Sequence, residues 1–228
     1  DRRTMCRMIN ALNRNSWLAV LTMASQCVVA HAAPASAAQE AASQSPVAEV
    51  RALFANCAAC HGADGGGVAD GTIPAIGAQP ATVITQQLLR FRSGERKDLR
   101  MQHFADPEHL ADRQQIDLVA RHVAGLRRST PAARGDGTQL ELGARRWSEG
   151  CAGCHGAFAG AVATRGIPAL AGQHAPYIAR KLREESNGMP GAPTLSQSHA
   201  AFFKKLTPVD RAALADYLSR LPPPEPSP

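Results

Sequence analysis

Apolar residues recur at helical spacing in two segments near the ends of the predicted structural units. Each segment begins with a residue that favours a helix start: Asp112 before Ile116, Val119 and Val123, and Thr207-Pro208 before Ala212, Leu214 and Leu218. Further helices are predicted over residues 46–55, 82–91, 139–147 and 176–185. No stretch shows the sustained alternation of apolar and polar residues that a half-buried strand requires. The pattern therefore predicts an all-α fold.

The predicted helices fall into two sets because the chain repeats itself with an offset of 94 residues. Identical residues recur in this register: Cys57 and Cys151, Cys60 and Cys154, His61 and His155, Gly62 and Gly156, Ile73-Pro74-Ala75 and Ile167-Pro168-Ala169, Gln79 and Gln173, Leu88 and Leu182, and Gly94 and Gly188. So many matches in one register indicate an internal duplication rather than chance. We therefore expect two similar domains in tandem.

Composition marks the segments around these domains. The residues before the first domain are mostly Ala, Ser, Gln and Pro, which is typical of a flexible spacer, and the Pro-rich end of the chain cannot form a helix. The expected organisation is a signal peptide at 1–32, a spacer at 33–46, a first domain at 47–128, a linker at 129–138, a second domain at 139–221 and a tail at 222–228.

The first 32 residues have the features of a secretory signal. Four arginines precede an apolar run at 17–30, and small residues follow that run. A retained membrane anchor is the alternative, but a run of roughly 14 residues is shorter than the ~20 needed to span a bilayer. We therefore expect cleavage of the signal and export to the periplasm.

Removal of the signal changes both the charge and the cysteine count. Residues 1–32 contribute +3 of the formal net charge of +6, so the remaining chain is only mildly basic. This balance argues against a nucleic-acid partner. Two of the six cysteines, Cys6 and Cys27, also leave with the signal. Aromatic residues make up only 4% of the chain, so a cofactor is expected to fill part of the interior.

The four remaining cysteines form two C-x-x-C-H motifs: Cys57, Cys60 and His61, and Cys151, Cys154 and His155. This is the attachment signature of c-type haem, in which two thiols bond to the vinyl groups of the porphyrin and the imidazole binds the iron. A thioredoxin-like pair has no use for the following histidine. A compact zinc site needs the two pairs about 15–20 residues apart, whereas these pairs are separated by 91 residues. A disulfide between neighbouring cysteines is a weaker alternative still.

A family resemblance follows from these motifs. The C-x-x-C-H-G segment, the Gly-rich loop, Ile-Pro-Ala, the following Gln and the later helix and Gly resemble the class I cytochromes c. The two-domain arrangement over about residues 47–221 resembles the dihaem cytochrome c4 family. The resemblance implies two covalently bound haem c groups. It also implies that Pro74 and Pro168 pack against their haems, while backbone carbonyls orient the Nδ1–H groups of His61 and His155.

The resemblance also bears on the sixth iron ligands. A class I domain usually supplies a Met from the irregular segment before its last helix, and in the first half Met101 is the only Met in that segment. Met101 is therefore the expected ligand, with gap-filling in the core as its alternative role. His103 and His109 lie nearby in the sequence and are interpreted as surface residues.

The second half departs from the family pattern. Met189 comes too early in the sequence, whereas local alignment places His199 at the position of Met101. We expect His199 to be the ligand, with Met189 and an open or water-bound iron as the alternatives. A thioether ligand raises the reduction potential of iron relative to a second imidazole, so the two haems would then differ in potential.

The resemblance implies an electron carrier between a respiratory or dehydrogenase donor and an acceptor such as a terminal oxidase, with peripheral membrane association as a further expectation. One alternative is a haem-bearing subunit of a larger oxidoreductase complex, and another is a peroxidase-like haem enzyme that uses the second haem. A basic cluster is expected either to meet haem propionates or an acidic partner, or to be a solvated helix end: Arg90, Arg92, Arg96, Lys97 and Arg100.

Overall fold

The computed structural model describes residues 45–187 and 197–227, with the side chains of residues 197–200 outside the description. The first half contains α2 (Pro46–His61), α3 (Ala81–Ser93), α4 (Leu99–Phe104) and α5 (Arg113–Ala124). The second half contains α6 (Leu140–Gly150), α7 (Ala152–His155), the 3-10 helix η1 (Ala163–Arg165), α8 (Ala175–Ser186), α9 (Gln197–Lys205) and α10 (Pro208–Arg220). Within the described residues, the extended pairing is a single bridge between Val162 and Ile167. The predicted all-α fold is confirmed.

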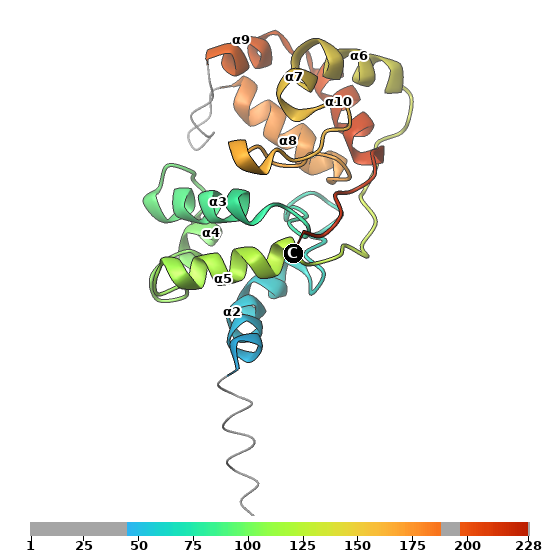
Figure 1. Cartoon of the computed structure of the whole chain (residues 1–228). Helices are drawn as coiled ribbons and strands as arrows, with labels where there is room; N and C mark the ends of the chain where they lie inside the picture. Colours follow the sequence, from blue (N-terminus) through green and yellow to red (C-terminus); the bar gives the residue numbers. More distant parts are fainter. Residues whose placement is uncertain (1–44, 188–196, 228) are drawn as a thin grey trace, which may run out of the picture.

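The first half is built around the contact of α5 with α2 and α3 (Figure 1). The Asp112 side chain accepts a hydrogen bond from the backbone N–H of Gln115 and so caps α5, as its position in the sequence predicts. The apolar positions that follow, Ile116, Val119 and Val123, are at most 2% exposed. Burial of these side chains removes apolar surface from water and holds the three helices together.

The second half uses the same plan, with α10 packed against α6 and α8. Thr207 forms a capping box with Asp210, and Leu214 and Leu218 are buried. Ala212, which was expected on the apolar face, is exposed, because the helix turns Ala213 and Ala215 toward the core instead.

Close approach of α6 and α10 depends on one glycine. A Cβ atom at Gly143 would lie 2.3 Å from the backbone oxygen of Ala213. The absence of a side chain at this position therefore lets the two backbones touch.

The two halves differ in the backbone conformation of their C-x-x-C-H motifs. In the first half α2 runs without a break through the motif to His61, beyond the predicted end at residue 55. In the second half the helix ends at Gly150 and restarts at Ala152, because Cys151 has φ −121° and ψ −38°, outside the helical conformation. The ring of Phe202 packs onto Gly150, where a Cβ would lie only 2.1 Å from it.

Hydrogen bonds fasten the connecting segment to both halves. One Asp64 oxygen accepts hydrogen bonds from the backbone and hydroxyl groups of Ser129 and Thr130, at 2.7–3.0 Å. His174 is 1% exposed and accepts from the backbone N–H of Ala133 at 3.0 Å through Nδ1. Its Nε2–H therefore donates to the carbonyl of Gly66 at 2.7 Å, across to the first half.

The C-terminal segment returns to the first half, where the backbone N–H of Ser227 donates to the carbonyl of Ala124 at 3.0 Å. Among residues 45–187 and 197–227, no helix combines the length and the apolar character needed to cross a membrane.

Candidate functional site

The first site is formed by the last turns of α2. His61 is 5% exposed, and its Nδ1 lies 2.9 Å from the carbonyl oxygen of Pro74. Because a carbonyl can only accept, Nδ1 carries the proton and Nε2 keeps a free lone pair. Burial lowers the pKa of His61, partly offset by the hydrogen bond to Pro74. The imidazole is therefore neutral near pH 7, which is the form that binds a metal.

The second site repeats this arrangement on α7. The Nδ1 of His155 lies 3.3 Å from the carbonyl oxygen of Pro168, so the contact implied by the family resemblance is present in both halves. The buried Trp147 supports the loop after the motif, since its Nε1–H donates to the carbonyls of Gly156 and Ala157 at 3.2 and 3.1 Å. Its ring centroid lies 5.8 Å from that of His155.

The first cysteine of each motif lies in an environment that favours the neutral thiol. Among the described residues, none of the four motif cysteines forms a disulfide. Cys57 and Cys151 pack against the cores of their halves, and burial raises the pKa of each thiol to about 11. A catalytic redox pair instead needs a lowered thiol pKa. In each half, two thiols stand just before an imidazole whose Nδ1 faces a proline carbonyl, and this donor set fits a c-type haem.

Met101 lies on α4, which is positioned from both ends. The Asp98 side chain accepts from the backbone N–H groups of Arg100 and Met101, at 3.1 and 3.3 Å. Beyond α4, Arg92 of α3 donates to the carbonyl of Ala105 at 2.7 Å and to that of Leu110. Met101 is half-buried against the same core cluster as Cys57. The helix therefore places Met101 and the first motif on one core.

The second half offers two candidate ligands, Met189 and His199. Met189 lies outside the described residues, and so does the side chain of His199, whose backbone belongs to α9. Phe202 and Phe203, on the same helix, pack against the second core cluster together with Cys151.

A pair of glutamines joins the two sites, and sequence reasoning did not assign it this role. The Gln173 amide accepts from the N–H of Ala75 at 2.9 Å and donates to its carbonyl at 2.8 Å. The Gln79 amide does the same to Ala169, at 3.0 and 2.7 Å. Both side chains are buried. Their identity at the 94-residue offset was the available signal, but an exact repeat does not reveal that each residue contacts the other half.

Each glutamine reaches the peptide group that orients a motif histidine. The peptide between Pro74 and Ala75 accepts from His61 through its oxygen and donates to Gln173 through its nitrogen. The peptide between Pro168 and Ala169 stands in the same relation to His155 and Gln79. One peptide unit thus separates each histidine from the opposite half.

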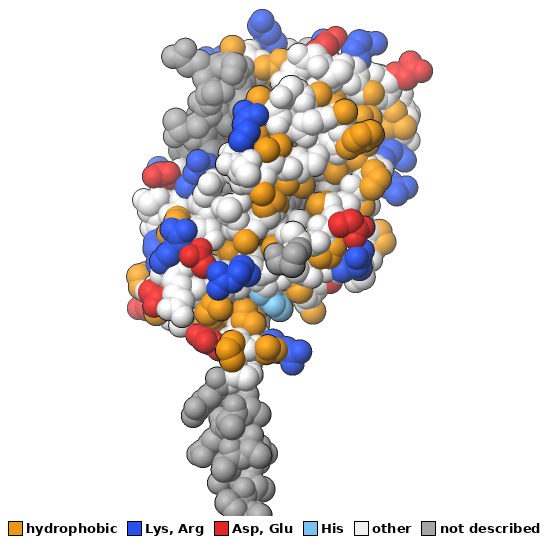
Figure 2. All heavy atoms as spheres, in the orientation of Figure 1, with side chains coloured by type: hydrophobic (Ala, Val, Ile, Leu, Met, Phe, Trp, Pro, Cys, Tyr) orange, Lys and Arg blue, Asp and Glu red, His pale blue; other side chains and the backbone are white. Residues whose placement is uncertain are grey.

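Three residues of the predicted basic cluster make contacts within the protein: Arg92, Arg96 and Arg100. Arg92 holds the segment after α4, and Arg100 pairs with Asp98 at 3.3 Å. Arg96 donates to Tyr177 of the second half at 3.1 Å and lies 4.5 Å above the ring of Phe91. On the face shown in Figure 2, Lys and Arg side chains are interspersed with Asp and Glu rather than gathered into one patch.

Comparisons with known proteins agree with this site. The cytochrome c family model matches twice, at residues 47–126 and 140–222. Cytochrome c4 of Pseudomonas aeruginosa is 32% identical over 180 residues, which cover 75% of this chain and 86% of that protein. The thiosulfate dehydrogenase electron acceptor of Thiomonas intermedia is 30% identical over 178 residues, covering 74% and 79%.

A solved structure shows the same similarity to cytochrome c4. The reduced recombinant cytochrome c4 from Pseudomonas stutzeri superposes with a TM-score of 0.67 and 25% identity, covering 78% of this chain and 98% of that one. The chain therefore belongs to the cytochrome c family as an electron-transfer protein of the cytochrome c4 type, with two tandem class I domains and two haem c groups bound covalently at Cys57 and Cys60 and at Cys151 and Cys154.

Proposed function

We propose that this cytochrome is a periplasmic carrier of single electrons between a dehydrogenase or another respiratory donor and an acceptor such as a terminal oxidase. Bound haem c supplies a one-electron Fe(III)/Fe(II) couple at each site. The protein contributes the ligands and the relative placement of the two halves.

The paired glutamines are the observation that carries this proposal. They connect the peptides that orient His61 and His155, and all four of their hydrogen bonds are buried. A buried and satisfied network of this kind resists rearrangement, because opening it would leave polar groups unpaired. Such rigidity suits electron transfer between two centres, whereas catalysis at iron needs a vacant or displaceable ligand position.

We further propose the ligands of each site. His61 and Met101 serve the first iron, and His155 and His199 serve the second, with Met189 as the alternative to His199. On this assignment the first haem has the higher potential, because the thioether of Met101 stabilises ferrous iron more than an imidazole does. Electrons would then rest preferentially in the first half.

The donor we favour is a periplasmic dehydrogenase of the kind named in the Thiomonas intermedia relative, which is a thiosulfate dehydrogenase electron acceptor. The signal-like residues 1–32 support export, and contact with a membrane-bound acceptor would give the protein a peripheral place at the membrane. A transient redox complex needs only a small docking surface, so no large partner interface is required.

The test uses the mature dihaem protein under native conditions. Anaerobic titration should reduce it by two electrons per chain, and the ferrous protein should not bind carbon monoxide rapidly. Oxidised protein mixed with thiosulfate and a purified thiosulfate dehydrogenase should be reduced, while thiosulfate alone should leave it oxidised. Rapid, tight binding of carbon monoxide at the second haem would contradict the carrier and favour a haem enzyme. Failure of enzymatic reduction alone would reject only this donor.

A further inference from the structure

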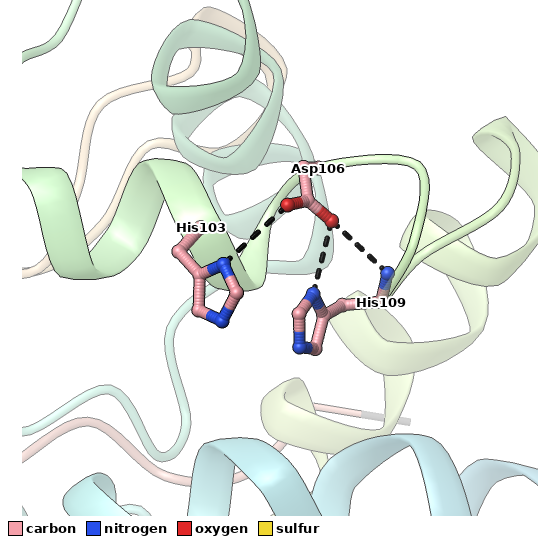
Figure 3. Close-up of side chains that lie close together, drawn as sticks. All are labelled: His103, Asp106 and His109. Carbon is pink, nitrogen blue, oxygen red and sulfur yellow. Dashed lines mark hydrogen bonds and ion pairs between the residues drawn. The ribbon is translucent and has the colours of Figure 1, made fainter.

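Two histidines and an aspartate meet at the end of α4, away from the C-x-x-C-H motifs in the sequence. Figure 3 shows the rings of His103 and His109 on the same side of Asp106, with both Nδ1 atoms directed at its carboxylate. His103 Nδ1 lies 3.6 Å from one oxygen and His109 Nδ1 lies 2.9 Å from the other. The ring centroids of the two histidines are 4.3 Å apart. Three potential ligand atoms, one per residue, lie within 4.8 Å of one another.

These separations suit a small tetrahedral ion. With metal–ligand bonds of about 2.0–2.1 Å, neighbouring ligand atoms around a tetrahedral ion lie about 3.3–3.4 Å apart. The two Nδ1–oxygen distances of 2.9 and 3.6 Å lie on either side of this value. All three potential ligand atoms lie within 4.8 Å of one another, so movement of the side chains alone would bring them to a common ion.

The carboxylate is held in place before any ion arrives. One Asp106 oxygen accepts from the backbone N–H groups of Glu108 and His109, at 2.9 and 3.1 Å. The hydrogen bonds of Asp106, that from the His109 ring first, lower its pKa, so it is an anion at neutral pH. The side chains of His103, Asp106 and His109 are 58%, 30% and 22% exposed, so an ion can enter from solvent and keep a water molecule as its fourth ligand.

We propose that His103, Asp106 and His109, none of them among the residues proposed to bind the haems, form a surface site for a divalent transition-metal ion such as Zn²⁺. Two imidazoles and one carboxylate match the preferences of Zn²⁺, Cu²⁺ and Ni²⁺, whereas Ca²⁺ and Mg²⁺ require sets of oxygen ligands. The ion would replace the hydrogen bond between the His109 ring and Asp106. It would also connect α4, which carries Met101, to the turn before α5.

The experiment is a calorimetric titration of the mature dihaem protein, produced without a histidine tag, with Zn²⁺ alone. One ion should bind per chain with saturable heat. Asp106→Asn, which keeps an oxygen acceptor for the turn, and His109→Ala should each weaken the affinity by about tenfold or more. His122→Ala is the control, because His122 belongs to the same half but its ring packs against Phe54 instead. Haem absorbance and melting temperature identify any variant that is misfolded.

A second probe reports on the ligands directly. Cu²⁺ added to the wild-type protein should show nitrogen hyperfine coupling from two imidazoles in its electron paramagnetic resonance spectrum, and His103→Ala should reduce this to one. The proposal is overturned if Zn²⁺ shows no saturable binding. It is equally overturned if folded His109→Ala and Asp106→Asn proteins bind the ion as tightly as the wild type.

Discussion

Gln173 and Ala75 exchange two hydrogen bonds across the boundary between the halves, and Ala75 shares a peptide group with the carbonyl that orients His61. The contact thus links a side chain of the second domain to the iron-ligand environment of the first. Gln79 makes the mirror contact with Ala169. This reciprocal pairing has consequences for the stability of the protein.

Substitution of Gln173 should destabilise the protein. Gln173→Ala leaves the buried N–H and carbonyl of Ala75 without partners, at a cost of about 1–3 kcal/mol, and lowers the melting temperature by several degrees. Gln79→Ala should have a similar effect by symmetry. Gln114→Ala, an exposed position on α5, is the matched control and should melt like the wild type. Thermal unfolding followed by circular dichroism checks this, and an unchanged melting temperature in Gln173→Ala would contradict a stabilising role.

Stability should depend on pH through Asp64. Burial acts against its charged form, but hydrogen bonds from Ser129, Thr130 and Gly66 outweigh burial and hold the pKa of Asp64 well below its usual range. The contribution of ionised Asp64 to the unfolding free energy is therefore fully present above about pH 4, the ordinary carboxyl pKa. It declines as the pH falls toward the pKa of Asp64 in the folded protein.

Asp64→Asn tests this pH dependence. It should reduce the unfolding free energy by about 1–2 kcal/mol at pH 7, after allowance for solvent screening. The gap between wild type and variant should shrink on acidification below pH 4. Denaturant unfolding across this range measures the gap, and Glu95→Gln, at an exposed position after α3, is the control. A gap that widens on acidification would show that the sign is wrong.

The contact of α6 with α10 should tolerate no side chain at Gly143. Gly143→Ala would place a Cβ 2.3 Å from the Ala213 oxygen, and separation of the helices should cost about 1–3 kcal/mol. Gly125→Ala provides the comparison, because its φ is −83° and the nearest atom to a new Cβ lies at 3.5 Å. That variant should be as stable as the wild type or slightly more so. Equal denaturation midpoints for the two variants would exclude the proposed close contact.

The proposed ligands predict selective changes in potential. Met101→Leu keeps an apolar side chain of similar size but removes the sulfur, so the potential of the first haem should fall while that of the second stays unchanged. For the second haem, His199→Ala should alter its spectrum and potential, and Met189→Leu should not. Spectroelectrochemical titration of each holoprotein resolves the two potentials. A second haem that responds to Met189→Leu alone would assign the ligand to Met189.

Local signals in the sequence were sufficient to predict much of the fold. The caps at Asp112 and Thr207 predicted the starts of α5 and α10, because a cap acts on N–H groups only two or three residues away. Ala212 was placed on the wrong face, since small rotations of α10 are set by what packs against it rather than by its own spacing. The break at Cys151 also escaped prediction, because it accompanies the packing of Phe202 from a distant helix.

By itself, the sequence determined the two haem attachment motifs and the register of the duplication, because both consist of residue identities at fixed spacings. Tertiary structure alone decided that Gln79 and Gln173 each contact the opposite half, since a repeat specifies equivalent positions but not how the two copies dock. It also decided that His103 and His109, interpreted as separate surface residues, converge on Asp106. Their convergence depends on the path of the backbone after α4, which Arg92 fixes from another helix through hydrogen bonds that no local pattern encodes.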